Sequence, residues 1–320
     1  MKAPQDPPHS VSQPEKVKKV AELPDGELAC RLRCGELLLD LAPFVARLRS
    51  ELPRLAFELA RLYKDFEVLP PDTFADFHIE VRREAGLRRW FRPQARFFYD
   101  DKPSFQALPV HHALPMVEWG LNWCVASHAH QYLVVHAAVL AQGDHALLMP
   151  APPGAGKSTL CAALMLSGWR LLSDELGLLD MKTRQIWGMA RPLNLKNQSI
   201  DIIRQFAPSA EFSDPVPDTT KGLVALLKPG SDSVARRQQP AQVRWVVLPR
   251  YQPQAAPRLS RMDRAEAVMV MAEQSFNYHI HGEQGFDALV HLCRISECFK
   301  FEYSQLDEGV KAINAMAAAS

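Results

Sequence analysis

The chain has 320 residues, enough for one large domain or two moderate ones. Hydrophobic residues make up 47% of it and charged residues 23%, as in ordinary globular proteins that fold in water. The formal net charge is +1 and no block of like charges occurs, so the composition does not favour a nucleic-acid partner. The sequence has no run of about 18 apolar residues, so we expect no membrane span.

The N-terminal residues and the cysteines both predict a cytoplasmic protein. Residues 1–24 are rich in proline and polar side chains and lack the apolar core of a signal peptide, so we expect a disordered tail there. The 6 cysteines have neither the spacing of a zinc site nor a C-x-x-C pair, which is the pattern of reduced thiols in the cytosol.

A small α+β module is expected at residues 25–130. Leucines at positions 37–41 indicate a short strand, and residues 44–63 have a helical pattern that Pro53 interrupts. Residues 74–82 alternate apolar and polar side chains as a half-buried strand does. Residues 90–99 indicate a further strand, at an edge or a bulge because of Pro93, and residues 114–130 indicate a helix.

Residues 131–320 are expected to form an α/β domain with a mixed β-sheet flanked by helices. Residues 207–221 and 229–241 are polar and predict loops. We expect strands at residues 132–140, 145–149, 169–173, 223–227, 243–248 and 258–262, a hairpin at residues 178–186, and helices at residues 160–167, 197–206, 265–275, 285–293 and 307–317.

The segment LLMPAPPGAGKST, residues 147–159, is typical of a phosphate-binding loop between a strand and a helix. The free N–H groups and positive end of the helix attract phosphate oxygens, and glycine lets the backbone approach them. The lysine adds a positive charge for the β- and γ-phosphates, and the following hydroxyl is a ligand for Mg²⁺. The expected binding residues for ATP are Pro153, Gly154, Ala155, Gly156, Lys157, Ser158 and Thr159.

The loop departs from the G-x-x-x-x-G-K-[ST] pattern at its first position. Ala151 stands where the pattern has glycine. Because alanine tolerates a positive φ poorly, we expect an ordinary backbone conformation at this residue.

Two adjacent carboxylates form the second signal. Asp174 and Glu175 follow the strand that comes after the phosphate-loop helix, and we expect them at the carboxyl end of that strand, where α/β sheets bind ligands. One carboxylate of such a pair can hold Mg²⁺, and the other can accept the proton of an attacking hydroxyl group. The alternative is that the acids cap a turn.

The stretch from HAAVL to GWRLLSDE resembles the catalytic core of HPr kinase/phosphorylase, and is more similar still to the group of HPr-kinase-related proteins. The matching residues are His136 on the strand before the loop, then Gly156, Lys157 and Ser158, then Asp174 and Glu175. The resemblance covers roughly residues 133–303. It implies a P-loop kinase core like that of HPr kinase and PEP carboxykinase.

By this resemblance Asp174 is the general base for a substrate hydroxyl, and Glu175 is the Mg²⁺ ligand together with Ser158. The parent enzymes have Asp where this chain has Glu175. His136 would lie close to the phosphates and orient the base or a water molecule. Alternatively, His136 has only a structural role, as a histidine with satisfied hydrogen bonds in a buried strand.

Phosphoryl transfer also benefits from a cation outside the loop, because charge spreads over the γ-phosphoryl oxygens. We expect Arg191 in this role, in a polar turn that it flanks with Lys196. Lys221 is a second candidate. The alternative for each of them is a solvated charge at the surface.

The leading hypothesis is an ATP- and Mg²⁺-dependent kinase that phosphorylates a serine-type hydroxyl of a protein, a peptide or a small molecule. The motif by which the parent enzymes hold HPr is replaced by RPLNLKN at residues 191–197, so the acceptor is left open. An ATPase or nucleotide switch is the alternative, with Asn197 or Gln198 placing a water molecule. A binding module without turnover is a third. The oligomeric state is also open, a homo-oligomer included.

Overall fold

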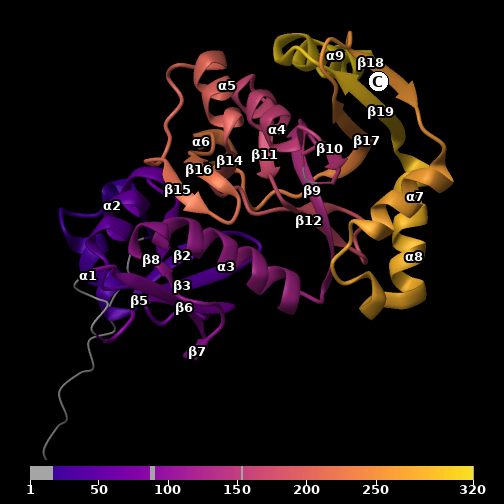
Figure 1. Cartoon of the computed structure of the whole chain (residues 1–320). Helices are drawn as coiled ribbons and strands as arrows, with labels where there is room; N and C mark the ends of the chain where they lie inside the picture. The colour runs from indigo at the N-terminus through magenta and orange to yellow at the C-terminus, as the bar shows by residue number, and fades with distance from the viewer. Residues whose placement is uncertain (1–16, 87–90, 153, 320) are drawn as a thin grey trace, which may run out of the picture.

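The computed structural model describes residues 17–86, 91–152 and 154–319. Two large sheets and one small sheet, with helices packed on them, form a mixed α/β structure (Figure 1). Within the described ranges, no helix combines the length and the apolar character needed to cross a membrane.

The first sheet is built from the N-terminal module and from β1, which precedes it in the chain. Its strand order is β1-β4-β2-β3-β5-β6-β7, with β8 beside β6, and only β3 and β5 among these neighbours run parallel. Helix α2 begins at Pro53, where the missing N–H of proline has no partner to lose. The strands are β1 (Lys18–Lys19), β2 (Leu37–Asp40), β3 (Val45–Arg49), β4 (Glu67–Leu69), β5 (Phe77–Arg83), β6 (Gln94–Tyr99), β7 (Lys102–Pro103) and β8 (Leu108–Pro109), and the helices are η1 (Val20–Glu22), α1 (Glu27–Cys34), α2 (Pro53–Leu62), η3 (Val110–His112) and α3 (Ala113–His128).

The second sheet has the order β13-β12-β9-β10-β17-β19-β18, with β11 also beside β9. Strands β10, β17 and β19 are parallel neighbours, so their carboxyl ends meet at one edge of the sheet. Ligands bind at such an edge in α/β proteins. The strands are β9 (Tyr132–Gln142), β10 (His145–Pro150), β11 (Arg170–Ser173), β12 (Leu176–Asp180), β13 (Ile186–Trp187), β17 (Gln242–Tyr251), β18 (Arg258–Arg261) and β19 (Glu297–Tyr303).

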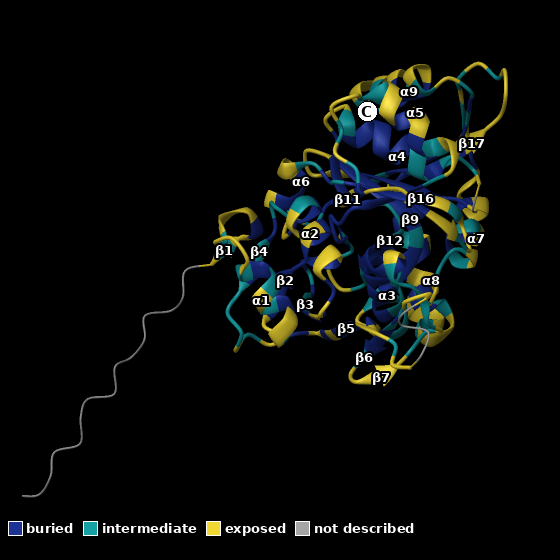
Figure 2. Ribbon diagram, turned by 60° about the vertical axis from the view of Figure 1, so that its left-hand side comes forward, coloured by how far each residue is buried: buried dark blue, intermediate teal, exposed yellow. Residues whose placement is uncertain are grey.

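Each face of this sheet is covered by its own set of helices. Helices α4 and α9 and the small sheet β14-β16-β15 with α5 share one apolar core with the strands, while α7 and α8 pack on the opposite face. Figure 2 shows the strands as a buried layer between more exposed helices. The remaining elements are α4 (Lys157–Leu166), β14 (Leu193–Lys196), α5 (Gln198–Phe206), β15 (Val216–Thr219), β16 (Gly222–Leu227), α6 (Ser231–Ala235), α7 (Arg264–Glu273), α8 (Tyr278–Ile295) and α9 (Leu306–Ala319).

The N-terminal module shares its core with the second sheet. Val134 of β9 and Leu176 and Leu178 of β12 lie in one buried cluster with the side chains of the first sheet and of α3. The two parts therefore pack tightly along this face, and α3 is the element that connects them in the chain.

Several predicted elements are wrong. Residues 44–63 are not one helical segment, because the alternating burial of VARLR makes β3 ahead of α2. The expected tail 1–24 contains β1 and η1, and its residues 1–16 lie outside the described part. Trp90, the first residue of the strand expected at residues 90–99, also lies outside it. The expected loops 207–221 and 229–241 contain β15 and α6. Strand β14 occupies residues that were expected to form a polar turn, and β19 was not expected, although ECFKFEY alternates as a strand does.

Candidate active site

The predicted phosphate loop lies between β10 and α4, at the edge where the parallel strands end. Gly156 is the N-cap of α4, whose first turn begins with Lys157 and Ser158. The loop is tied to the neighbouring strands: the N–H of Tyr251 donates to the carbonyl of Ala155 at 3.0 Å, and the hydroxyl of Tyr303 donates to the carbonyl of Gly156 at 3.2 Å. Pro153 lies outside the described residues.

Only glycine suits position 156. Its φ is +88°, and a Cβ atom built there would lie 2.6 Å from the hydroxyl oxygen of Tyr303. Side chains avoid both this conformation and this contact. Ala151 is not among the residues with positive φ, so its expected ordinary conformation is confirmed.

The ammonium group of Lys157 is buried and unpaired. The residue is 7% exposed, and its Nζ has no hydrogen-bond partner among the described residues. Burial lowers the pKa of Lys157 to about 8, while the nearby carboxylates of Glu175 and Asp174 act in the opposite direction. Because a buried cation without hydrogen bonds is costly, the site is suited to an anion that supplies them. Phosphate oxygens at a helix N-terminus fit this requirement.

Asp174 and Glu175 directly follow the carboxyl end of β11, as predicted, and they also link it to β12, which pairs with the same neighbour. Ser173 of β11 lies opposite Val139 of β9, and β12 resumes with Leu176 opposite His136. The link stays close to β9, because the N–H of Ala137 donates to the carbonyl of Glu175 at 3.1 Å. An interrupted strand is a common way to turn side chains toward a site.

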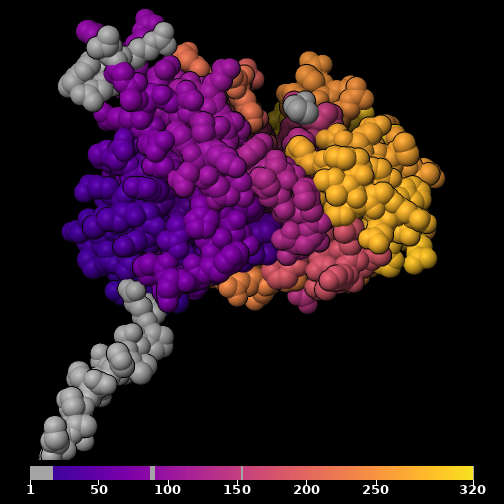
Figure 3. Space-filling model, turned by 90° about the horizontal axis from the view of Figure 1, so that it is seen from below, coloured from indigo at the N-terminus to yellow at the C-terminus, as the bar shows by residue number. Residues whose placement is uncertain are grey.

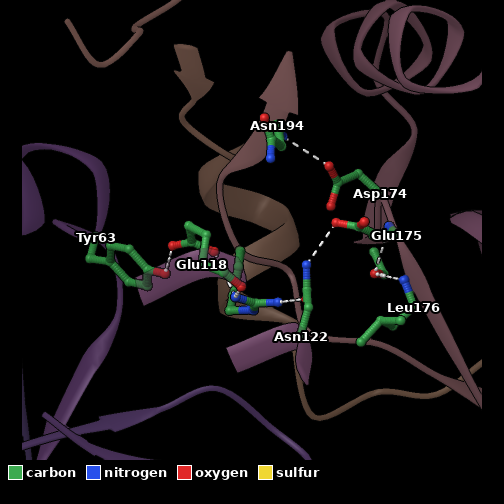
Figure 4. A network of polar contacts seen from close by, with 9 residues as sticks. Tyr63, Glu118, Asn122, Asp174, Glu175, Leu176 and Asn194 are labelled. Carbon is green, nitrogen blue, oxygen red and sulfur yellow. Dashed lines mark hydrogen bonds and ion pairs between the residues drawn. The ribbon is translucent and has the colours of Figure 1, made fainter. Parts of the chain in front are cut away.

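Separate elements hold the two carboxylates. Oδ2 of Asp174 accepts the backbone N–H of Asn194 on β14 at 2.9 Å, and Oε2 of Glu175 accepts the amide group of Asn122 on α3 at 2.7 Å (Figure 4). Burial, and then the charge of Glu175, raise the pKa of Asp174 to about 6. A carboxyl group with a pKa near neutrality is suited to accept a proton from a hydroxyl group.

The other predicted loop residues have different surroundings. Thr159 is bound to α5, because its hydroxyl donates to the hydroxyl of Ser199 at 2.9 Å. The sequence gave no indication of this contact. Ser158, together with Gly154 and Gly156, lines the cavity described below.

His136 lies on the face of the sheet that α4 covers. It is two residues after Val134 on β9, and Val134 packs against the N-terminal module. Its ring lies 5.8 Å from that of Phe276, and its backbone N–H donates to the carbonyl of Gln274 at 2.7 Å. Burial, and then the charge of Lys157, lower the pKa of His136 to about 4. The imidazole is therefore neutral at pH 7 and lines the same cavity as Lys157.

The structure corrects the position expected for Arg191. Its guanidinium is buried in an ion pair with Glu118, with 2.6 Å between NH1 and Oε2, and its other end donates to Asn122. It does not line the cavity. Glu118, in turn, accepts the hydroxyl of Tyr63, so the pair belongs to a network that begins in the N-terminal module (Figure 4).

Besides Lys157, two lysines, Lys196 and Lys221, line the cavity together with the acids. Burial, and then the charge of Lys221, lower the pKa of Lys196. Lys221 also lies over the ring of Trp119, with Nζ 5.4 Å from its centre. The outer cation predicted from the sequence is thus available from either lysine.

These groups line one cavity, with a volume of about 630 Å³. His136, Lys157, Ser158, Asp174 and Glu175 line one part of it, and apolar and aromatic side chains line another. Viewed from below, the molecule is hollowed between the N-terminal module and the C-terminal part (Figure 3). The volume is in the range of sites that take small molecules and cofactors. The aromatic and apolar lining is formed by Tyr251, Tyr303, Ile202 and Leu306.

The donor set fits Mg²⁺ that arrives with a nucleotide. Mg²⁺ in such sites is held by one or two protein oxygens together with phosphate oxygens and water. The hydroxyl of Ser158 and the carboxylates of Asp174 and Glu175 line one cavity. Across the described ranges, no group of three or more His, Cys, Asp or Glu side chains is arranged to hold a metal by itself.

Four residues of the site were not expected from the sequence: Glu118, Asn122, Asn194 and Tyr303. Glu118 had a signal, because a single acid within the apolar segment LPMVEWGLNW needs a buried partner. Asn194 and Tyr303 lie on β14 and β19, two of the strands that were not expected. No family model matches the chain, and a search of the curated proteins finds no match either.

Proposed function

We propose that the protein is an ATP- and Mg²⁺-dependent phosphotransferase with a P-loop kinase core, which moves the γ-phosphoryl group to a serine-type hydroxyl. The observation that carries this proposal is the buried, unpaired Nζ of Lys157 at the N-terminus of α4, in one cavity with Asp174 and Glu175. The resemblance of these residues to HPr kinase/phosphorylase supports it. The acceptor is a protein, a peptide or a small molecule.

Each residue has a role in this proposal. The N–H groups at the start of α4 and Lys157 bind the phosphates, and Ser158 and Glu175 hold Mg²⁺. The metal neutralises charge on the β- and γ-phosphates when it is bound. Lys196 or Lys221, in place of Arg191, neutralises the outer oxygens of the transferred group. Neutral His136 donates or accepts a hydrogen bond beside the phosphates without adding charge.

The transfer step uses Asp174 as the base. The acceptor oxygen forms a bond to the γ-phosphorus while the bond to the β–γ bridging oxygen breaks, and ADP leaves. The hydroxyl proton passes to the carboxylate of Asp174, whose backbone hydrogen bond from Asn194 holds it in place. The product is a phosphate ester and ADP. We place this reaction in the cytoplasm, where ATP is available and where free cysteines, like the six of this chain, are usual.

A second candidate function is an ATPase that acts as a nucleotide switch. Asn197 and Gln198 line the cavity, and an amide side chain can place a water molecule for attack on the γ-phosphate. In that case hydrolysis proceeds without any acceptor.

The two candidates differ in the fate of the γ-phosphate. ATP labelled at this position is incubated with Mg²⁺, the protein and a lysate of the source cell, and Asp174→Asn is the control, since it keeps the shape and removes the base. A labelled acceptor that forms only with the wild-type protein supports the kinase. Free phosphate released equally by both proteins, with nothing else labelled, favours the switch. If nothing is released or labelled, a binding module without turnover replaces both.

A further inference from the structure

Asn122 connects the buried Arg191 to the acid pair. Its Nδ2 donates to Oε2 of Glu175 at 2.7 Å, and its Oδ1 accepts a hydrogen bond from NH2 of Arg191 (Figure 4). These two partners define the orientation of the amide, because turning it over would place NH₂ against the guanidinium and oxygen against the carboxylate. The side chain therefore has one stable arrangement.

Arg191 is itself held rigidly. Its side chain is 7% exposed and that of Glu118 is 4% exposed, and the NH1–Oε2 distance between them is 2.6 Å. The other oxygen of Glu118 accepts the hydroxyl of Tyr63, the C-cap residue of α2. Charged groups in such a buried network have little freedom, because any other position leaves a charge unpaired.

The network begins on the N-terminal module and ends in the cavity. Glu118 and Asn122 are four residues apart in α3, so they project from the same side of this helix. The helix packs on β5 and β6 of the first sheet. Glu175, on the link between β11 and β12 of the second sheet, is thus held by α3, a helix that packs on the first sheet.

We propose that Asn122 is a positioning residue, which fixes the carboxylate of Glu175 so that it can bind a divalent cation. Through α3, the N-terminal module thereby contributes to the metal site. A neutral amide orients the carboxylate without cancelling its charge, whereas a lysine or arginine in direct contact would compete with the metal. Hydrogen-bond partners of metal-ligating side chains contribute about 10–100-fold to metal affinity. This inference rests on the proposed function for the role of the metal, but not for the contact itself.

The test compares Asn122→Leu with Asn314→Leu. Both asparagines are half-buried, and Asn314 makes a side-chain hydrogen bond far from the cavity, to the indole N–H of Trp169 at 2.7 Å. Asn122→Leu removes the hydrogen bonds to Glu175 and Arg191, and Asn314→Leu removes one to a residue that does not line the cavity. ATP affinity is measured by calorimetry with Mg²⁺ and with EDTA. We expect the gain in affinity from Mg²⁺ to fall about 10-fold in Asn122→Leu, with binding in EDTA unchanged, and to be kept in Asn314→Leu.

A second measurement needs no nucleotide. In protein labelled with ¹³C at glutamate carboxyl groups, the Glu175 signal is identified by its loss in Glu175→Gln. It should move in Asn122→Leu and stay in place in Asn314→Leu. An unmoved signal, or a moved signal with an unchanged gain from Mg²⁺, overturns the inference. If no variant and no wild-type protein binds ATP, the proposed function fails, and the carboxyl signal alone decides whether Asn122 holds Glu175.

Discussion

The backbone N–H of Asn194 donates to Oδ2 of Asp174 at 2.9 Å, and this bond joins the small sheet β14-β16-β15 to the acid pair. A backbone donor cannot be removed by exchanging a side chain, and it fixes the carboxylate relative to β14. The next residues of this strand bring Lys196 to the cavity. The base and the outer cation of the proposed reaction are therefore positioned by the same short strand.

The pH dependence of transfer should follow Asp174. Because its pKa is raised to about 6 by burial and by Glu175, its base form is lost below that pH, and kcat/KM should fall as the pH drops through 6. Glu175→Gln removes the neighbouring charge, so the acidic limb should move to lower pH. The measurement is a pH–rate profile at saturating Mg²⁺. Glu283→Gln, which removes an exposed acid on α8, is the control and should leave the acidic limb of the profile in place. If the acidic limb stays at the same pH in Glu175→Gln, it does not report the ionisation of Asp174.

Lys157→Met should make the protein more stable and unable to bind ATP. The pKa of Lys157 is lowered to about 8 from 10.5, so between these values the unfolded chain binds more protons and stability rises with pH. Below about pH 8 the buried charge destabilises the fold, and its removal should stabilise it by about 1–3 kcal/mol at pH 7. Urea unfolding at pH 7 with and without ATP measures both effects. Lys182→Met, in an exposed turn, should change neither; a less stable Lys157→Met protein would show that the lysine is not an unpaired charge.

Gly156→Ala should be more harmful than Gly154→Ala. Both residues have a φ of +88°, but a Cβ at Gly154 meets no atom within 4 Å, whereas at Gly156 it meets the hydroxyl of Tyr303. Both variants therefore carry the conformational cost of about 1–3 kcal/mol, and only Gly156→Ala adds a steric clash. Thermal unfolding and ATP titration measure the difference. Adding Tyr303→Phe should recover part of the loss in Gly156→Ala, and equal effects of the two glycine variants would argue against the clash.

Arg191→Met should unfold the protein more easily rather than slow its chemistry alone. It leaves Glu118 buried without its cation, which costs about 3–5 kcal/mol. Exchanging both partners, as in Glu118→Gln with Arg191→Met, should cost less, because no charge is left unpaired. Arg258→Met, whose side chain is 72% exposed in its ion pair with Glu302, should cost under about 1 kcal/mol. An Arg191→Met protein of normal stability but without activity would restore the role that the sequence analysis assigned to this residue.

Lys196→Met is the corresponding test of the outer cation. Removing a charge that stabilises the transferred phosphoryl group should lower kcat by about 10²–10³-fold, with little change in stability. Single-turnover rates at saturating ATP measure this. The same loss in Lys221→Met, with Lys196→Met unaffected, would assign the role to Lys221 instead.

The local pattern around Lys157 could be predicted from the sequence because a strand, a loop and a helix are determined by neighbouring residues. The acid pair was also found at the end of its strand, but the sequence did not show that it links β11 to a second strand on the same neighbour. The contacts between distant segments could not be found in this way. Arg191 and Asn122 are far apart in the chain, and nothing near Arg191 in the sequence indicates that Glu118 holds it.

Strands β19 and β14 were not predicted from the sequence, for two different reasons. In β19, the three charged residues of ECFKFEY are exposed or half-buried, and the alternation is clear once the preceding helix is known to end at Ile295. In β14, Leu193 and Leu195 are buried on the core side, but Asn194 and Lys196, which alternate with them, resemble a turn in composition. Tertiary packing, rather than local preference, decides such a segment.

The shared core around Val134, Leu176 and Leu178 has a consequence for how the chain can be divided. A fragment that starts at residue 131 contains the whole phosphate loop and the acid pair, yet it exposes these three side chains to water and lacks α3. Such a fragment should aggregate or bind the separately produced N-terminal half, and the two halves together should reconstitute what neither holds alone. During synthesis, the N-terminal half leaves the ribosome first and can offer a folded surface on which the later strands assemble.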